Sequence, residues 1–269
     1  MQSLPLYQVD AFTNKLFGGN PAAVVPCPEF PSSKLMQQIA AENNLSETAF
    51  VVATGKRAFD IRWFTPNKEV RLCGHATLAA AHVLFAAVPK EVKELKISTQ
   101  KAGRLTVSRA KKGKYTLNFP ADKARKGEVT KTLRQALGLE PLEVYEGTDD
   151  LLVVLSKESM VRKLTPNFEQ LSRIKRRGVI VTAPGKKVDF VSRCFYPRYG
   201  ILEDPVTGSA HTLLTPFWAK RLGKKQMKAE QLSERLGKLG CELKGKRVLL
   251  TGGAQTFLSG RIFPDTIQY

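Results

Sequence analysis

The chain resembles itself at two pairs of short segments, and this internal repeat constrains the fold more than any other feature. Residues 62–66 (RWFTP) match residues 193–197 (RCFYP), and residues 73–76 (CGHA) match residues 207–210 (TGSA), in the same order. In each copy, an apolar strand pattern that ends at a proline leads through an acidic loop to a turn of small residues that opens a helix. We therefore predict two related halves: a first lobe of residues 1–117 and a second of residues 118–269, with the last few residues able to return to the first lobe.

The helix expected after Gly74 lacks a polar stripe, since residues 76–85 read ATLAAAHVLF. Such a helix must be buried on all sides, and His82 within it is expected to be a core residue with satisfied nitrogens. The matching helix of the second half contains Pro216, which predicts a kink or an interruption. Another helix is predicted from a cap at Ser32 or Ser33 to Asn43 and Asn44.

Strand patterns separate these helices. They cover residues 4–9, 22–25, 49–53, 59–64, 104–109 and 115–119. The pattern predicts a mixed α/β (α+β) chain of two pseudo-symmetric lobes, each a curved or barrel-like sheet around a central buried helix.

The net charge of +19, from 43 Lys and Arg against 24 Asp and Glu, would favour a polyanionic partner. The basic residues, however, fall at positions expected to be solvated: near a helix end at residues 220–228, in a turn at 111–114, and after a helical stretch at 173–177. No interleaved aromatic residues or zinc-finger spacing accompany them. We expect no specific nucleic-acid binding, only weak nonspecific adhesion at low salt.

The four cysteines, Cys27, Cys73, Cys194 and Cys241, lie far apart without metal-ligand spacing, so neither a zinc site nor a disulfide framework is indicated. The first residues lack a secretory pattern, and the longest apolar stretch, residues 76–88, falls short of a membrane span. These features predict a cytoplasmic protein with reduced thiols and no membrane partner.

Two helix starts, at Gly74 and Gly208, carry most of the chemical signal. A helix start presents unpaired N–H groups and a partial positive charge, and glycine lets a carboxylate or phosphate approach closely. Residues that can transfer or orient protons stand next to them, namely His75, Asp204, Ser209 and His211.

These segments resemble the phenazine-biosynthesis-like (PhzF-like) family, which has the diaminopimelate epimerase fold. The matching stretches are residues 10–13 (DAFT), Phe17, 19–24 (GNPAAV), 44–50 (NLSETAF), 62–66, 73–77 (CGHAT) and 203–211 (EDPVTGSAH), with a weaker match at 231–236. The chain departs from the usual Arg-Gly-Gly of the family, because it reads Arg235-Leu236-Gly237.

The resemblance implies an active-site cleft between two lobes, commonly in a homodimer, acting on a small unsaturated or cyclic carboxylic acid without cofactor or metal. Glu47 would be the general acid/base, moving a proton between carbon atoms. His75 and Asp204 would position the substrate and stabilise developing charge. The substrate-binding set would comprise the backbone of Gly74 and Gly208, the Ser209 hydroxyl, and the adjacent Cys73 and Thr207.

Several alternatives remain open. A racemase with one thiol per half is disfavoured, because Thr207 stands where the second thiol would be and cannot act as a thiolate-like base. Glu47 could be a surface carboxylate, His75 a helix cap, and Asp204 a turn former before Pro205. The leading alternative function is a catalytically silent scaffold that binds a metabolite or a protein partner, and a basic nucleic-acid binder ranks third.

Overall fold

The computed structural model describes residues 3–100 and 103–264, and the chain forms two compact units. One unit contains the chain up to Asn118 together with the segment from Thr251, and the other contains Phe119–Leu250. The segment that returns to the first unit is thus longer than the last few residues of the expected second lobe, 118–269. The reason is that β18 (Ala254–Ile262) pairs antiparallel with β1 (Leu4–Ala11).

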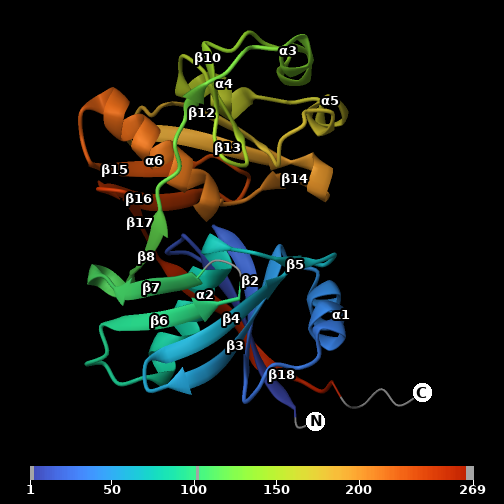
Figure 1. The fold of residues 1–269 in the computed structure, drawn as a ribbon, viewed down its shortest axis with the longest axis vertical. Helices are drawn as coiled ribbons and strands as arrows, with labels where there is room; N and C mark the ends of the chain where they lie inside the picture. Colours follow the sequence, from blue (N-terminus) through green and yellow to red (C-terminus); the bar gives the residue numbers. More distant parts are fainter. Residues whose placement is uncertain (1–2, 101–102, 265–269) are drawn as a thin grey trace. The chain divides into compact units, whose positions relative to one another are not determined.

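The first unit is built on a mixed sheet (Figure 1). Besides β1 and β18, its strands are β2 (Asn20–Cys27), β3 (Glu47–Gly55), β4 (Ala58–Phe64), β5 (Glu69–Val70), β6 (Glu94–Thr99), β7 (Gly103–Arg109) and β8 (Tyr115–Pro120). The pairs β1–β2, β3–β4, β4–β5, β6–β7 and β7–β8 are antiparallel, whereas β2–β3 and β4–β6 are parallel. The expected strands are confirmed.

Two helices pack on this sheet. Helix α2 (Gly74–Ala87) contacts β1, β2, β3 and β18, and nearly all of its residues are buried, as its apolar sequence predicts. Helix α1 (Ser33–Asn43) is capped by the Ser32 hydroxyl and ends at Asn44 in the left-handed conformation, also as predicted. Its Met36 packs into a separate cluster with Phe50 and Phe64.

The second unit repeats this arrangement. Its strands are β9 (Arg125–Lys126), β10 (Glu143–Glu146), β11 (Leu151–Val154), β12 (Val179–Pro184), β13 (Phe190–Tyr196), β14 (Ile201–Asp204), β15 (Gln226–Gln231), β16 (Gly237–Lys244) and β17 (Arg247–Gly252), the last of which runs into the first unit. Its helices are α3 (Lys131–Leu137), α4 (Glu158–Lys163), α5 (Phe168–Ser172) and α6 (Gly208–Leu222), together with the short 3₁₀ turn η2 (Pro197–Tyr199). The other 3₁₀ turn, η1 (Lys111–Gly113), belongs to the first unit.

Equivalent pairings relate the two units. In the first, β2 is parallel to β3, β3 antiparallel to β4, and β4 parallel to β6 and antiparallel to β5. In the second, β11, β12, β13, β15 and β14 pair in the same senses. Arg62 on β4 forms a two-pronged ion pair with Glu69 on β5, and Arg193 on β13 forms the same pair with Glu203 on β14. The repeated segments of the sequence therefore occupy equivalent places.

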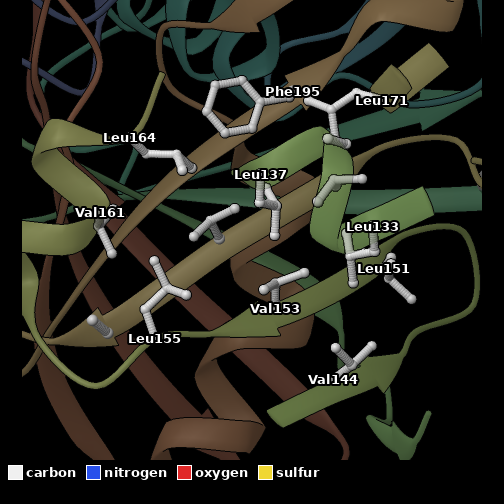
Figure 2. Close-up of a cluster of buried hydrophobic side chains, with 14 of the residues drawn as sticks. Leu133, Leu137, Val144, Leu151, Val153, Leu155, Val161, Leu164, Leu171 and Phe195 are labelled. Atoms are coloured by element: carbon white, nitrogen blue, oxygen red, sulfur yellow. The ribbon is translucent and has the colours of Figure 1, made fainter. Parts of the chain in front are cut away.

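In the second unit, successive side chains along a strand point to opposite faces of the sheet, and helices cover both faces. Figure 2 shows Leu133 and Leu137 of α3, Val161 of α4 and Leu171 of α5 gathered over one side of the sheet with Val153. The intervening Thr182 faces the other way, where its hydroxyl accepts a hydrogen bond from the Trp218 indole of α6 at 3.0 Å. The sheet thus lies between α3–α5 and α6.

The interruption expected at Pro216 does not occur, because α6 continues through it to Leu222. Proline removes the N–H that would bond to the carbonyl of Thr212, four residues earlier. That carbonyl accepts instead from the backbone N–H of Asp122 at 3.1 Å. The helix therefore loses one internal bond without leaving a buried carbonyl unpaired.

No helix in the described part of the chain is long and apolar enough to span a bilayer. All four cysteines are buried and free, which agrees with the absence of a disulfide framework expected from their spacing.

Candidate active site

The first backbone N–H groups of α2 receive no capping hydrogen bond from the side chain of the N-cap residue. Cys73 occupies the N-cap position in an extended conformation, and its side chain makes no capping hydrogen bond. Its carbonyl accepts bonds from the N–H and hydroxyl of Thr77. The first-turn N–H groups that begin at Gly74 are therefore not satisfied by the cap side chain, which is the condition for binding an anion there.

A carboxylate and an imidazole meet at this helix start. His75 Nε2 lies 3.0 Å from Glu47 Oε2, and His75 Nδ1 lies 3.1 Å from the side-chain nitrogen of Asn20. Glu47 begins β3 and Asn20 begins β2, and because these strands are parallel their starts lie at the same edge of the sheet. His75 is buried and Glu47 is nearly so, so the sheet edge and the helix together fix all three side chains.

The contact with Glu47 favours the charged form of His75. Burial opposes a charge on the ring, but the pKa of His75 is raised well above its usual value, and the Glu47 carboxylate is the charged neighbour that favours the imidazolium. An imidazolium held against Glu47 is a group that can donate a proton or stabilise negative charge. The alternative in which His75 only caps the helix does not describe these contacts.

Cys73 is a neutral thiol. Burial, reinforced by Glu47, raises its pKa to about 11. Its sulfur lies 3.6 Å from His75 Nδ1. A thiol in that state is not a base at neutral pH. Glu47, Cys73 and His75 nevertheless offer ligand atoms within 4.8 Å of one another, so they are the described residues at which a metal ion of zinc-like preference could be held.

The start of α6 carries a different set of groups. The side chain of its N-cap residue, Thr207, makes no capping bond and donates instead to Asp204 Oδ2 at 2.5 Å. Gln231, on β15, links both residues: its side-chain oxygen accepts from the Thr207 N–H at 2.8 Å, and its side-chain nitrogen donates to the Asp204 carbonyl at 2.6 Å. Asp204 and Gln231 are buried.

Gln231 was not among the expected site residues. The available signal was its place at the beginning of the weaker family match, residues 231–236. Because it reaches Thr207 from a strand that follows α6, only the packing of β15 beside β13 shows that the two residues meet.

A second residue missed from the sequence is Arg177. It was expected to lie on a solvated surface with residues 173–176, but its side chain is only 33% exposed. It forms a two-pronged ion pair with the buried Asp150 and donates to the Ser209 hydroxyl at 3.2 Å. A run of basic residues could not distinguish this position, because the contacts join segments far apart in the chain.

The remaining two histidines behave differently from each other. His211 is fully buried, its Nδ1 lies 2.8 Å from the Thr207 carbonyl, and burial lowers its pKa to about 4, so it is neutral. His82 lies 3.1 Å from the Tyr115 hydroxyl and 3.0 Å from the Thr256 hydroxyl. Both of its nitrogens are thus satisfied, as expected, although the residue is half-buried.

The expected site residues therefore fall into one group in each unit. Glu47, Cys73, Gly74 and His75 gather at the start of α2, together with Asn20. Asp204, Thr207, Gly208 and Ser209 gather at the start of α6, together with Gln231 and Arg177.

The departure at Leu236 coincides with an unusual backbone. Leu236 has φ of 54°, in the left-handed region where glycine is favoured. Its side chain compensates in part by packing against the core of the second unit. Leu236 therefore holds a backbone conformation that glycine adopts with less strain.

Comparison with known proteins agrees with this architecture. The family model described as "Phenazine biosynthesis-like protein" matches residues 9–260. A Pseudomonas aeruginosa protein named as an uncharacterized isomerase is 51% identical over 259 residues, covering 96% of this chain and 98% of the relative, and other bacterial relatives share that description.

Solved structures give the same result. The crystal structure of a phenazine biosynthesis protein of the PhzF family from Enterococcus faecalis is 45% identical, with a TM-score of 0.93, covering 97% of this chain and all of the other. A probable proline racemase from Agrobacterium radiobacter is 12% identical, with a TM-score of 0.66, covering 98% and 94% of the two chains, which shows a shared fold alone.

Relatives that match this chain over nearly their whole length are named isomerases, and the chain shares the fold of solved PhzF-family structures, so its class is that of an isomerase. Within that class, the chain belongs to the phenazine-biosynthesis-like family.

Proposed function

We propose that this isomerase moves a proton between carbon atoms of a small unsaturated or cyclic carboxylic acid, with Glu47 as the general acid/base. The observation that carries the proposal is the 3.0 Å contact between Glu47 Oε2 and His75 Nε2 at the uncapped start of α2. A carboxylate fixed beside a proton donor is the arrangement that carbon-acid chemistry requires.

The reaction consists of two proton transfers. Glu47 takes a proton from one carbon, and the electron pair of the broken C–H bond spreads into the conjugated acid. Glu47 then returns the proton to a second carbon as the double bond moves. The charged form of His75 and the first-turn N–H groups of α2 stabilise the negative charge between these steps, a contribution of several kcal/mol in comparable sites.

The second helix start supplies further groups. In this proposal Asp204 positions the substrate, while the Gly208 backbone and the Ser209 hydroxyl bind its carboxylate. The Gln231 contacts support these roles, because they hold both Asp204 and Thr207 in place.

A mechanism with two thiols has no support in these contacts. The Cys73 thiol has a pKa of about 11, and the equivalent residue, Thr207, uses its hydroxyl to bind Asp204. A single carboxylate that both takes and returns the proton fits the groups present.

The test is deuterium incorporation from D₂O, followed by NMR, with a panel of hydroxy- and amino-substituted cyclohexadiene carboxylates. The wild type should exchange at least one panel member, and Glu47→Gln should bind it but exchange none. Glu42→Gln, an exposed carboxylate of α1, serves as the matched control and should exchange normally. Exchange by Glu47→Gln would remove Glu47 from the mechanism, and binding without exchange by the wild type would favour a silent scaffold.

A further inference from the structure

Contacts with Asp150, Ser209 and Tyr196 fix the orientation of the Arg177 guanidinium, but their hydrogen bonds use only its Nε and Nη2 atoms. Its Nε donates to Asp150 Oδ1 at 2.8 Å, and its Nη2 contacts Asp150 Oδ2 and the Ser209 hydroxyl. The guanidinium also lies over the Tyr196 ring, 5.6 Å from its centre. Asp150 is buried and belongs to the turn before β11, so the orientation of the guanidinium is fixed by the sheet.

These contacts use one edge of the guanidinium. In the part of the chain that the structure describes, Nη1 makes no hydrogen bond, so its two N–H donors are available beside Ser209. Ser209 accepts from Arg177, which leaves its own O–H available to donate. Both side chains therefore offer donors at the first turn of α6, whose cap residue makes no capping bond.

A third observation concerns Tyr196, whose ring lies beside the Arg177 guanidinium. Tyr196 is buried, and its hydroxyl has no hydrogen-bond partner among the described residues. Burial and then the nearby Asp150 raise the pKa of Tyr196, so the hydroxyl stays protonated and remains a donor. A buried hydroxyl without a hydrogen-bond partner is costly, so this polar group beside Arg177 is one that a bound molecule could satisfy.

We propose that Arg177 is an anion-binding residue of this enzyme, which holds the carboxylate of the substrate through Nη1 together with the Ser209 hydroxyl and the first backbone N–H groups of α6. Asp150 is a positioning residue that acts through Arg177. The choice of a carboxylate as the anion rests on the proposed function, whereas the donor cluster stands on the contacts given above.

The local charges define what the site selects. Asp150 and the nearby Asp149 offset the charge of Arg177, so an anion is held by directed donors rather than by a net positive field. A planar carboxylate can accept from Nη1 and from Ser209 with its two oxygens. A carboxamide of the same shape replaces one acceptor with a donor, which Arg177 would oppose.

The experiment compares cyclohex-1-ene-1-carboxylate with its carboxamide, by ligand-observed NMR titration. We expect the wild type to prefer the carboxylate by about 10-fold or more, the effect of a charge-assisted hydrogen bond. Arg177→Met should abolish the preference, and Arg177→Lys should restore part of it. The matched control is Arg176→Met, which removes the neighbouring arginine paired with Glu146 and should keep the preference.

Arg177→Met leaves Asp150 buried without its partner and can therefore unfold the protein. Two further variants test the proposal without leaving an unpaired buried charge. The double variant Arg177→Gln with Asp150→Asn removes both charges together and should also lose the preference. Ser209→Ala keeps the ion pair and should weaken carboxylate binding several-fold. Circular dichroism and thermal unfolding confirm that each variant is folded.

The possible results separate this inference from the proposed function. Equal binding of both probes by the wild type, or an unchanged preference in folded Arg177 variants, would overturn the role of Arg177. Deuterium exchange that depends on Glu47 but not on Arg177 would leave the isomerase proposal intact. Loss of the preference in Arg177 variants, with no exchange of any acid by the wild type, would support the anion site and refute the proposed proton transfer by Glu47.

Discussion

Individual side chains determine the chemistry of this chain through their protonation states. The chain contains only three histidines, and each has a different environment. The neighbouring Glu47 carboxylate raises the pKa of His75 against burial, whereas burial lowers the pKa of His82 and brings that of His211 to about 4. The sequence could suggest that His75 belongs to the site, but not its protonation state, which depends on the packing of β3 against α2.

A titration of the three imidazole Cε1–H signals by NMR tests these environments. We expect one signal, from His75, to titrate above pH 6.5 and two to titrate below it, the lower of them near pH 4. His82→Gln assigns one signal by its loss. Three titrations clustered near the ordinary value would contradict the structure.

The His211 environment also predicts how stability depends on pH. Its folded pKa of about 4 lies below its unfolded value of 6.5, so the unfolded chain gains a proton first as the pH falls. The free energy of unfolding should therefore drop between pH 6.5 and pH 4, by about 3 kcal/mol at most from this residue. Urea unfolding at several pH values measures the drop, and constant stability across this window would count against a neutral buried His211.

Replacement of Glu47 should reverse the state of His75. In Glu47→Gln the carboxylate that favours the imidazolium is absent, so burial becomes the larger influence and the pKa of His75 should fall. The same NMR titration measures this fall, with Glu42→Gln as the control. A pKa of His75 unchanged in Glu47→Gln would show that the two side chains are not coupled.

At the scale of elements, the apolar periodicity of the sequence predicts the positions of helices better than a proline within a helix predicts where the helix breaks. The apolar run of α2 requires a buried helix, and the Ser32 cap and Asn44 end of α1 follow local rules. Of the kink or interruption predicted at Pro216, the interruption does not occur, and the compensating bond to the Thr212 carbonyl comes from Asp122, a residue far away in the chain. Local patterns predict where helices form, whereas long-range contacts decide which irregularities they tolerate.

The close approach of β16 to the loop before α6 gives a stability prediction. A Cβ at Gly237 would lie 2.2 Å from a methyl carbon of Val206, next to the Thr207 cap. Gly237→Ala should therefore lower the free energy of unfolding by about 1–3 kcal/mol, the usual cost of overpacking. Gly55→Ala is the matched control, since its added carbon would meet only an ordinary contact at 3.6 Å. Equal stability of the two variants would argue against this packing.

At the scale of the whole molecule, the repeat in the sequence corresponds to a repeat in topology. Short matches around Arg62 and Arg193 fall on equivalent strands that carry equivalent ion pairs. Much of the fold could thus be predicted from two segments and their order. The long return from Thr251 could not, because it depends on the pairing of β18 with β1, for which the sequence contains no distinct signal.

The charge of +19 is also a property of the whole molecule. Binding to a 20-base-pair DNA duplex should be measurable at about 20 mM salt and lost near 150 mM, because counterion release drives it. Fluorescence anisotropy across this range measures the effect. Retained affinity with a sequence preference near 150 mM salt would instead indicate a specific nucleic-acid partner.

The central claim is that Glu47 carries the proton between carbon atoms. The most direct measurement follows deuterium incorporation from D₂O into the acid that the wild type exchanges, at saturating concentration, beside the measured affinity of Glu47→Gln for the same acid. The account predicts that Glu47→Gln retains affinity and loses incorporation by several orders of magnitude. Incorporation at the wild-type rate in this variant would contradict it.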